Sequence, residues 1–182
     1  MRAMGSCEQV FSQQEVDAFV ERRLRLPFEK AVIRNRQNVD VEDTSKRKSE
    51  RQYVPVDYRD PFIAKLTSYI AHISTTHYKR HNLWIARPWE LLRYQQGDFF
   101  GRHCDKIDPN FGPFVSAVVY LGGEYEGGDV KLFHDQHTSD HTIIQQQAGY
   151  VLSYPSETYH EVTQVTKGVR LSLANFFGVR HD

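Results

Sequence analysis

The spacing of apolar residues predicts a helix near the start of the chain. Four apolar residues recur at helical spacing and share one face: Val16, Phe19, Val20 and Leu24. Ser12 and Glu15 precede this face with the spacing of a capping box, in which each residue binds the other's backbone N–H. These two signals together predict a helix that runs from Ser12 to about Pro27.

A second helix is predicted to begin at Asp60, because Asp is a favoured helix cap and Pro61 fits the first helical position. Its buried face is expected to consist of Phe62, Leu66, Ile70 and Ile73. Between the two helices, Asn35 to Arg51 is polar and charged. This segment is interpreted either as a solvated loop or as a flap that closes over an active site when substrate binds.

From Trp84 onward the pattern changes to short β-type runs that are separated by turn residues such as Gly122-Gly123 and Gly127-Gly128. The expected strands are Trp89–Gln95, Phe114–Leu121, Val130–Phe133, Tyr150–Tyr154 and Val169–Phe177. Two helices followed by many short strands predict an α+β fold in which helices buttress a sandwich or jelly roll. We expect a single domain over 1–182, with helical support over about 1–83 and a jelly-roll core over about 84–182.

Composition and charge narrow the class of protein. The 182 residues are 40% hydrophobic, and the 23 basic residues balance the 23 acidic ones. This balance disfavours nucleic acid or an anionic membrane as a partner. No apolar run has the length of a membrane span, and no signal peptide is apparent at the N-terminus. With only Cys7 and Cys104, no disulfide framework is expected, so we predict a cytoplasmic protein.

Three residues are candidate metal ligands. His103 and Asp105 are two positions apart, so on an extended backbone both side chains point to the same side. His160, which follows the Tyr150–Tyr154 strand, supplies a third ligand. Two imidazoles and one carboxylate form the facial triad of non-haem Fe(II) oxygenases, which leaves coordination positions open for dioxygen and a 2-oxo acid.

Arg170 makes this metal site more specific. It lies ten positions after His160, at the start of an apolar strand where an isolated positive charge is costly to bury. A planar guanidinium can bind the distal carboxylate of 2-oxoglutarate through two parallel hydrogen bonds, and Ser172 on the same strand face can add a hydroxyl donor. Alone, Arg170 would also fit a structural ion pair.

Three stretches then carry a resemblance to a known family. They are LLRYQQGDFFGRHCD, SAVVYLGGEYEGGDVKLF and AGYVLSYPSETYHEVTQVTKGVRLSLANFF. From about Trp89 to Phe177 the chain resembles the prolyl/lysyl hydroxylase-like (prolyl 4-hydroxylase-type) branch of the Fe(II)/2-oxoglutarate-dependent oxygenases. The shared pattern is a Tyr, a Gly, the HxD pair, a Gly-Gly hairpin, a distal His and a basic residue some ten positions later.

The resemblance implies a double-stranded β-helix that holds Fe(II) between two sheets, with 2-oxoglutarate and dioxygen as co-substrates and ascorbate as an accessory reductant. It also implies a co-substrate contact for Tyr94, although strand alternation alone would fit a packed core tyrosine. Because Asp105 retains the carboxylate that related halogenases lack, hydroxylation is favoured over halogenation.

The expected activity is hydroxylation of an aliphatic C–H, in a prolyl, lysyl or similar side chain of a protein or peptide, with release of succinate and CO2. Three alternatives stay open: a free amino acid or small metabolite as substrate, a nucleobase as substrate, and a non-catalytic sensor that binds iron and 2-oxoglutarate. The sequence carries no readable code for the substrate, which we expect to contact the loops Asn35–Arg51, Lys106–Phe114 and His134–Ile143.

Some residues allow two interpretations. His134, His137 and His141 would fit a second metal site, but a solvated hairpin loop is favoured. Phe99 and Phe100 fit either the substrate entrance or the core. Trp84 and Trp89 are expected in the core.

Overall fold

The computed structural model describes residues 5–34, 39–79, 83–85, 87–106 and 114–179. Its two helices are α1 (Gln13–Leu24) and α2 (Pro61–Thr76), and both begin where the sequence predicts. The Ser12 hydroxyl accepts a hydrogen bond from the Glu15 N–H, while the Glu15 carboxylate accepts one from the Ser12 N–H at 2.8 Å. The Asp60 carboxylate accepts a hydrogen bond from the Phe62 N–H at 2.9 Å and so caps α2.

The predicted buried faces of the helices are largely confirmed. All four residues predicted for α2 are buried, and Val16 and Phe19 of α1 are fully enclosed. Leu24 is an exception, because its side chain is 48% exposed. The apolar stripe of α1 therefore ends at Val20, which packs against the core, while Leu24 lies in the last turn beyond it.

Strands from both halves of the chain form one large antiparallel sheet. Its order is β1 (Ser6–Gln9), β14 (Tyr150–Pro155), β10 (Val115–Gly122), β17 (Arg170–Val179), β8 (Trp89–Tyr94), β6 (Glu50–Val54) and β2 (Glu29–Lys30), and β7 (Leu83–Ile85) also pairs with β17. Five further strands form a smaller antiparallel sheet in the order β13 (His141–Ile144), β12 (Val130–Phe133), β15 (Tyr159–Val162), β9 (Phe99–His103) and β5 (Arg47–Lys48). Two short antiparallel pairs complete the described strands: β11 (Tyr125–Gly127) with β16 (Val165–Gly168), and β3 (Ile33–Arg34) with β4 (Asp40–Val41).

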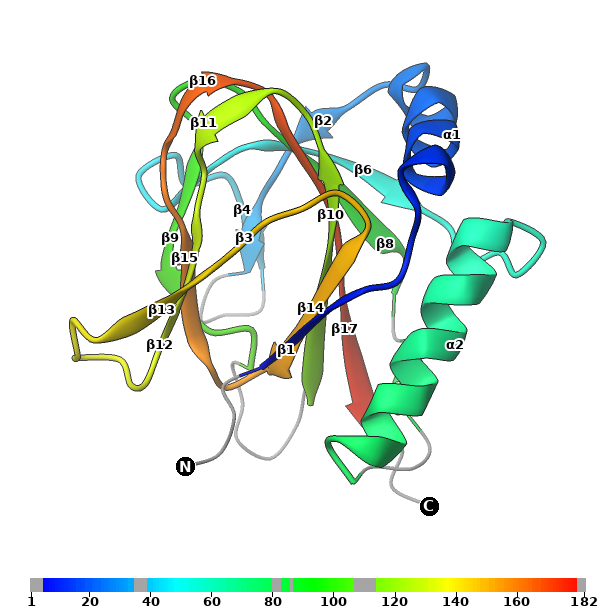
Figure 1. The fold of residues 1–182 in the computed structure, drawn as a ribbon. Helices are drawn as coiled ribbons and strands as arrows, with labels where there is room; N and C mark the ends of the chain where they lie inside the picture. The colour runs from blue at the N-terminus through cyan, green and yellow to red at the C-terminus, as the bar shows by residue number, and fades with distance from the viewer. Residues whose placement is uncertain (1–4, 35–38, 80–82, 86, 107–113, 180–182) are drawn as a thin grey trace.

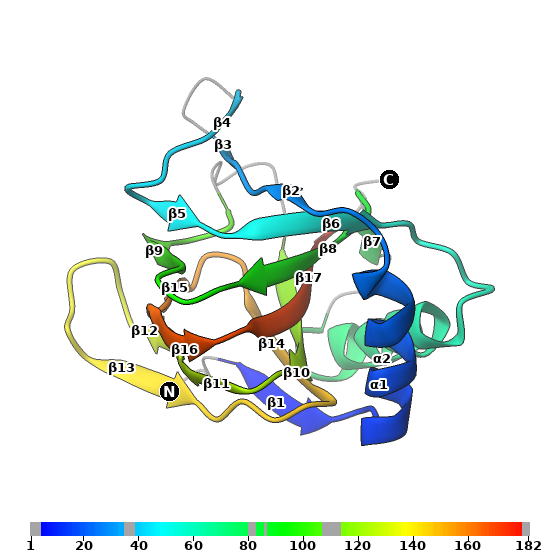
Figure 2. The ribbon, with the colours of Figure 1, turned by 90° about the horizontal axis from the view of Figure 1, so that it is seen from above.

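Two hydrophobic cores lie on opposite faces of the large sheet. The first core joins α1 and α2 to one face of that sheet and includes Phe19, Leu66, Trp89 and Leu173. The second core fills the space between the two sheets and includes Leu92, Leu132 and Leu152. Figure 1 shows both helices beside the large sheet, with the smaller sheet on the side away from them, and Figure 2 shows the same arrangement from above. This is the predicted α+β fold with a double-stranded β-helix.

The first 83 residues contribute more than helical support. The expectation of one continuous loop from Asn35 to Arg51 is wrong for its described part, because β4, β5 and the start of β6 lie there. β5 pairs with β9 of the smaller sheet, and β6 pairs with β8 of the large sheet. The polar composition of this segment indicates a loop. Cross-strand pairing and the burial of Arg47 nevertheless attach the segment to the barrel. Residues 35–38 lie outside the described residues.

The other predictions for loops and aromatic residues have mixed outcomes. Residues 134–140 form an irregular connection, and β13 begins at His141. Trp89 is fully buried, as predicted, while the side chain of Trp84 and residues 107–113 of the Lys106–Phe114 loop lie outside the description. Gly127 and Gly128 both have positive φ angles and form the predicted turn between strands. No helix in the described parts of the chain is long and apolar enough to cross a bilayer.

Candidate metal and co-substrate site

The fold brings the two predicted histidine ligands side by side. His103 ends β9, His160 lies in β15, and the two residues face each other in the antiparallel pairing of these strands. Their ring centroids are 4.1 Å apart. The Nδ1 atom of each ring lies close to a backbone carbonyl, 2.8 Å from Gly101 O and 2.9 Å from Thr158 O. Because a carbonyl only accepts, each Nδ1 carries the proton and donates it, which leaves each Nε2 unprotonated, the form that binds a metal.

Asp105 completes the set. One carboxylate oxygen lies 3.6 Å from His103 Nε2 and the other lies 3.7 Å from His160 Nε2. The potential ligand atoms of the three residues all lie within 4.8 Å of one another, and within the described ranges no other cluster of His, Cys, Asp and Glu does so. The Ser116 hydroxyl donates to Asp105 Oδ2 at 2.6 Å, so Oδ1 is the oxygen left for a metal.

The protonation states of these groups suit a divalent cation. Burial raises the pKa of the Asp105 carboxyl, but the two histidines and Ser116 outweigh burial and lower that pKa to about 2. Burial and repulsion by His103 lower the pKa of His160 to about 4. At neutral pH the site therefore offers a carboxylate and a neutral His160 imidazole, the forms in which both side chains bind metals. The donor set fits Fe(II).

Two aromatic residues lie beside the ligands: Phe100, for which the sequence left the substrate entrance and the core open, and Tyr154, which the sequence did not single out. Phe100 stacks on the His103 ring with centroids 3.6 Å apart, and it also contacts the second core. Tyr154 is buried in β14, and its hydroxyl lies 3.1 Å from His160 Nε2 and 3.4 Å from Asp105 Oδ2. The alternation of β14 was the available signal for Tyr154, because it places this residue on the same inner face as Leu152.

Arg170 lies inside the same barrel and has only neutral partners. Its side chain is 1% exposed, Nε donates to Gln146 Oε1 at 2.7 Å, and Nη1 donates to Ser172 Oγ at 3.0 Å. Nη2 is buried without a hydrogen-bond partner. No described carboxylate forms an ion pair with this guanidinium, so the structural ion pair that the sequence left open is not observed. A buried, uncompensated guanidinium fits an anionic ligand such as the distal carboxylate of 2-oxoglutarate.

Further side chains lie around this guanidinium besides Ser172. Tyr94 is the cross-strand partner of Arg170, and the Arg170 Cζ atom lies 5.2 Å from the centre of its ring. Tyr120, which the sequence did not single out, lies 5.7 Å from the same atom and has a buried hydroxyl without a hydrogen-bond partner. Gln146, also missed, accepts from Arg170 and donates to Gly128 O at 2.9 Å. Neither Tyr120 nor Gln146 belongs to the motif, so only the fold identifies them.

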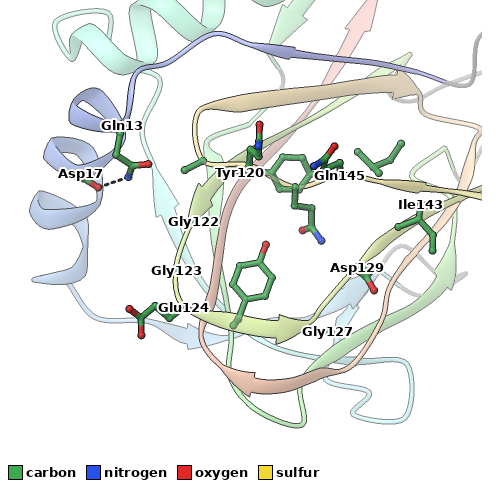
Figure 3. Close-up of a pocket in the computed structure, with 15 residues that line it drawn as sticks. Gln13, Asp17, Tyr120, Gly122, Gly123, Glu124, Gly127, Asp129, Ile143 and Gln145 are labelled. Carbon is green, nitrogen blue, oxygen red and sulfur yellow. Dashed lines mark hydrogen bonds between the residues drawn. The ribbon is translucent and has the colours of Figure 1, made fainter.

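A cavity of about 1050 Å³ reaches this end of the barrel. It is lined by Tyr120, Gln146 and polar residues that include Gln13, Asp17 and Asp129. Figure 3 shows the side chains of Tyr120 and Gln145 among those around it, with α1 at one side. None of the three candidate metal ligands lines this cavity, so it lies at the Arg170 end of the barrel and away from the metal site.

The sequence of the chain is similar to those of known Fe(II)- and 2-oxoglutarate-dependent enzymes. Residues 89–178 match the family model described as the 2OG-Fe(II) oxygenase superfamily. A PKHD-type hydroxylase of Shewanella oneidensis is 29% identical over 177 residues, which cover 90% of this chain and 72% of that protein. The chain spans only 44% and 56% of the length of two further PKHD-type hydroxylases.

Solved structures share the fold. A prolyl-4-hydroxylase of Pseudomonas putida superposes with a TM-score of 0.73 at 20% identity, over 98% of this chain and 94% of that one. A prolyl hydroxylase of Trichoplax adhaerens, solved with a peptide of hypoxia-inducible factor, superposes with a TM-score of 0.69 at 15% identity, over 96% and 83% of the two chains.

The metal-binding geometry, the barrel and the family match define one class of protein. The chain belongs to the 2OG-Fe(II) oxygenase superfamily and is similar to the prolyl hydroxylases of that superfamily. Fe(II) is the metal and 2-oxoglutarate the co-substrate of this superfamily.

Proposed function

We propose that this protein hydroxylates an aliphatic C–H in a prolyl, lysyl or similar side chain of a protein or peptide. The observation that carries the proposal is a buried Arg170 without an anionic partner, in the same barrel as a His-Asp-His set. A metal site alone would fit many chemistries. A metal site with a separate cationic pocket for a dicarboxylate is typical of 2-oxoglutarate chemistry.

In this proposal His103, Asp105 and His160 would hold Fe(II), and the hydrogen bond from Ser116 to Asp105 Oδ2 leaves Oδ1 as the oxygen available to the metal. The lone pairs on the two Nε2 atoms point to the same centre because both Nδ1 atoms donate to backbone carbonyls. Three protein ligands would leave a bound metal with open positions for co-substrate and dioxygen.

Arg170 binds the distal carboxylate of 2-oxoglutarate through its Nη atoms, since Gln146 occupies Nε. Ser172, Tyr94 and the unpaired Tyr120 hydroxyl lie beside the same carboxylate position and can donate to it. When bound, iron and co-substrate supply the oxidant that hydroxylates the substrate, with release of succinate and CO2. The buried walls of the second core exclude water from this reaction.

A peptide or protein substrate is favoured over a free amino acid or a nucleobase. The support comes from related proteins, which are named prolyl hydroxylases and of which one was solved with a peptide. The balanced charge of the chain disfavours nucleic acid. A cytoplasmic location and ascorbate as an accessory reductant stay predictions.

The test is the anaerobic addition of 2-oxoglutarate to protein loaded with Fe(II). Chelation through the 2-oxo and C1 carboxylate groups should produce a metal-to-ligand charge-transfer band. Arg170→Ala should weaken 2-oxoglutarate binding at least 30-fold, because it removes charge-assisted hydrogen bonds worth about 2 kcal/mol or more. Arg59→Ala is the control, since Arg59 is exposed and pairs only with Asp57 among described acidic residues. A folded, iron-loaded protein that shows no such band would refute the proposal.

Measurements of turnover distinguish the proposed hydroxylase from a non-catalytic sensor that binds iron and 2-oxoglutarate. Succinate release that depends on an added proline- or lysine-containing peptide supports the proposed activity. Succinate release only with a free amino acid or an oligonucleotide would show that the substrate class is wrong. Tight binding of iron and 2-oxoglutarate without oxygen consumption would favour the sensor.

A further inference from the structure

Three arginines surround one buried carboxylate in this fold. Glu90 of β8 is 7% exposed, and guanidinium nitrogens of Arg47, Arg51 and Arg87 lie 3.7, 3.9 and 3.8 Å from its oxygens. The four residues come from β5, β6, the segment before β8, and β8 itself. We call these four residues the arginine cluster. They play no part in the metal and co-substrate site described above.

Strand pairing places the arginine cluster away from Arg170. On β8, Glu90 and Tyr94 lie on the same face because they are four residues apart. Tyr94 pairs with Arg170 on β17, whereas Glu90 pairs with Ala174. The cluster therefore begins four residues, or about 13 Å, along the barrel from the co-substrate end.

The same pairing places the arginine cluster at the metal end. Ser116, which donates to the ligand Asp105, pairs with Phe176 on β17. The Arg87 guanidinium lies over the ring of Phe176, 4.1 Å from its centre. Arg87 is 42% exposed, so the cluster is open to solvent on this side.

A second line of contacts links the arginine cluster to the metal ligands. The Arg47 guanidinium lies 4.6 Å from the centre of the Phe100 ring. Phe100 stacks on His103 with centroids 3.6 Å apart. One aromatic ring thus separates Arg47 from a metal ligand, and a molecule whose reacting carbon lies at the metal is close enough to extend to the cluster.

The charges of the arginine cluster do not balance. Arg51 has a second partner in Glu29, which is 58% exposed, whereas Arg47 and Arg87 form ion pairs only with Glu90 among the described residues. The remaining hydrogen bonds of Arg47 go to neutral acceptors, Ser49 Oγ and Val32 O. Three positive charges thus meet one buried negative charge and one solvated one.

The contacts to Glu90 leave N–H groups of the three arginines free to donate hydrogen bonds to another acceptor. All three contacts to Glu90 are longer than 3.5 Å, so none is a hydrogen bond. Guanidiniums bind carboxylates best through short, parallel pairs of hydrogen bonds. A second carboxylate that entered from the Arg87 side would form such contacts and neutralise the excess charge.

We propose that the arginine cluster binds a carboxylate of the substrate and so selects acidic peptides, with Asp or Glu beside the oxidised residue. This inference rests on the proposed function, since it assumes a substrate that reaches the metal. The α-carboxylate of a free amino acid has the same chemistry, and the experiment separates the two sources.

The experiment uses the full chain loaded with Mn(II) and 2-oxoglutarate, without dioxygen, and measures peptide binding by calorimetry. Three end-blocked peptides carry one central proline followed by Asp, Asn or Lys. The Asp peptide should bind at least tenfold more tightly than the Asn peptide, and the Lys peptide should bind most weakly. Free proline, N-acetylproline and prolinamide test the α-carboxylate as the source.

Two substitutions should change the preference in opposite directions. Arg87→Glu should reverse it, so that the Lys peptide binds more tightly than the Asp peptide. Glu90→Gln should strengthen binding of the Asp peptide severalfold, because it removes the competing carboxylate. A cluster that only braces the strands would weaken all peptides alike in both variants. Arg59→Glu is the matched charge reversal outside the cluster and should change nothing. Arg87→Gln replaces Arg87→Glu should the latter fail to fold, and it should abolish the preference for Asp.

Equal affinity for the three peptides, or a preference unchanged by Arg87→Glu, overturns the inference. If proline binds in an Arg87-dependent way, prolinamide does not bind, and the three peptides bind equally, the carboxylate comes from a free amino acid and the acidic peptide is refuted as its source. Failure of the proposed function gives a different result from failure of this inference. A charge preference in peptide binding without any peptide-dependent succinate release refutes hydroxylation. Succinate release that is equal for all three peptides refutes only the role of the arginine cluster.

Discussion

Replacing Ser116 by alanine tests how the barrel prepares Asp105 for a metal. The Ser116 hydroxyl donates to Asp105 Oδ2 at 2.6 Å, and Ser116 is 1% exposed. A buried hydrogen bond to a charged group contributes about 1.5–3 kcal/mol. Loss of an outer-shell partner of a metal ligand typically lowers metal affinity about 10- to 100-fold, which corresponds to about 1.4–2.8 kcal/mol. We therefore expect Ser116→Ala to weaken metal binding by this factor.

The measurement is a competition titration with Co(II), in parallel with urea unfolding of the metal-free protein. Ser153→Ala is the matched control. Ser153 is 0% exposed in the adjacent strand and accepts a hydrogen bond from the neutral Tyr78 hydroxyl at 3.0 Å. Both variants should lose stability, but only Ser116→Ala should lose metal affinity. Metal binding of Ser116→Ala within twofold of the unmodified protein, or an equal loss in Ser153→Ala, would contradict the role of Ser116.

Three further predictions concern the Arg170 end, the buried His160 and a helix cap. A Cβ atom at Gly128, where φ is +66°, would lie 2.9 Å from Arg170 Cδ, so Gly128→Ala should displace the guanidinium and weaken 2-oxoglutarate binding at least fivefold in the charge-transfer titration, with metal affinity unchanged. The folded pKa of His160, about 4, lies below its unfolded value of 6.5, so the unfolded state binds more protons between these pH values. The unfolding free energy of the metal-free protein should therefore fall by up to roughly 3 kcal/mol from pH 6.5 to pH 4, and by less in His160→Gln; equal slopes would refute this reasoning. Ser12→Ala should cost about 1 kcal/mol in urea unfolding, because it breaks the capping box of α1, and no change in stability would argue against that box.

Local signals in the sequence were sufficient for the helices and for the core strands. Ser12, Asp60 and Pro61 mark helix starts because capping depends on side chains within three residues of each other. The β-type runs of the second half were correct to within two residues at each end, because alternation and glycine turns are also local. The segment around Arg47 was predicted as a loop because its strands are only two to five residues long and polar. The partners of β5 and β6, in β9 and β8, are about 35 to 53 residues away along the chain, so local composition gives no indication of this pairing.

For the site, order and spacing were enough to select His103, Asp105, His160 and Arg170 as candidates, because the HxD pair and the distal His and Arg keep a recognisable separation along the chain. Only the tertiary structure showed that the three candidate ligands meet within 4.8 Å and that Arg170 has no anionic partner among the described residues. It also placed Ser116, Tyr120 and Gln146 beside them, and gathered three arginines around Glu90. These residues come from several strands and connecting segments and belong to no common motif. Cross-strand pairing and barrel closure bring them together, and both depend on contacts between segments far apart in the chain.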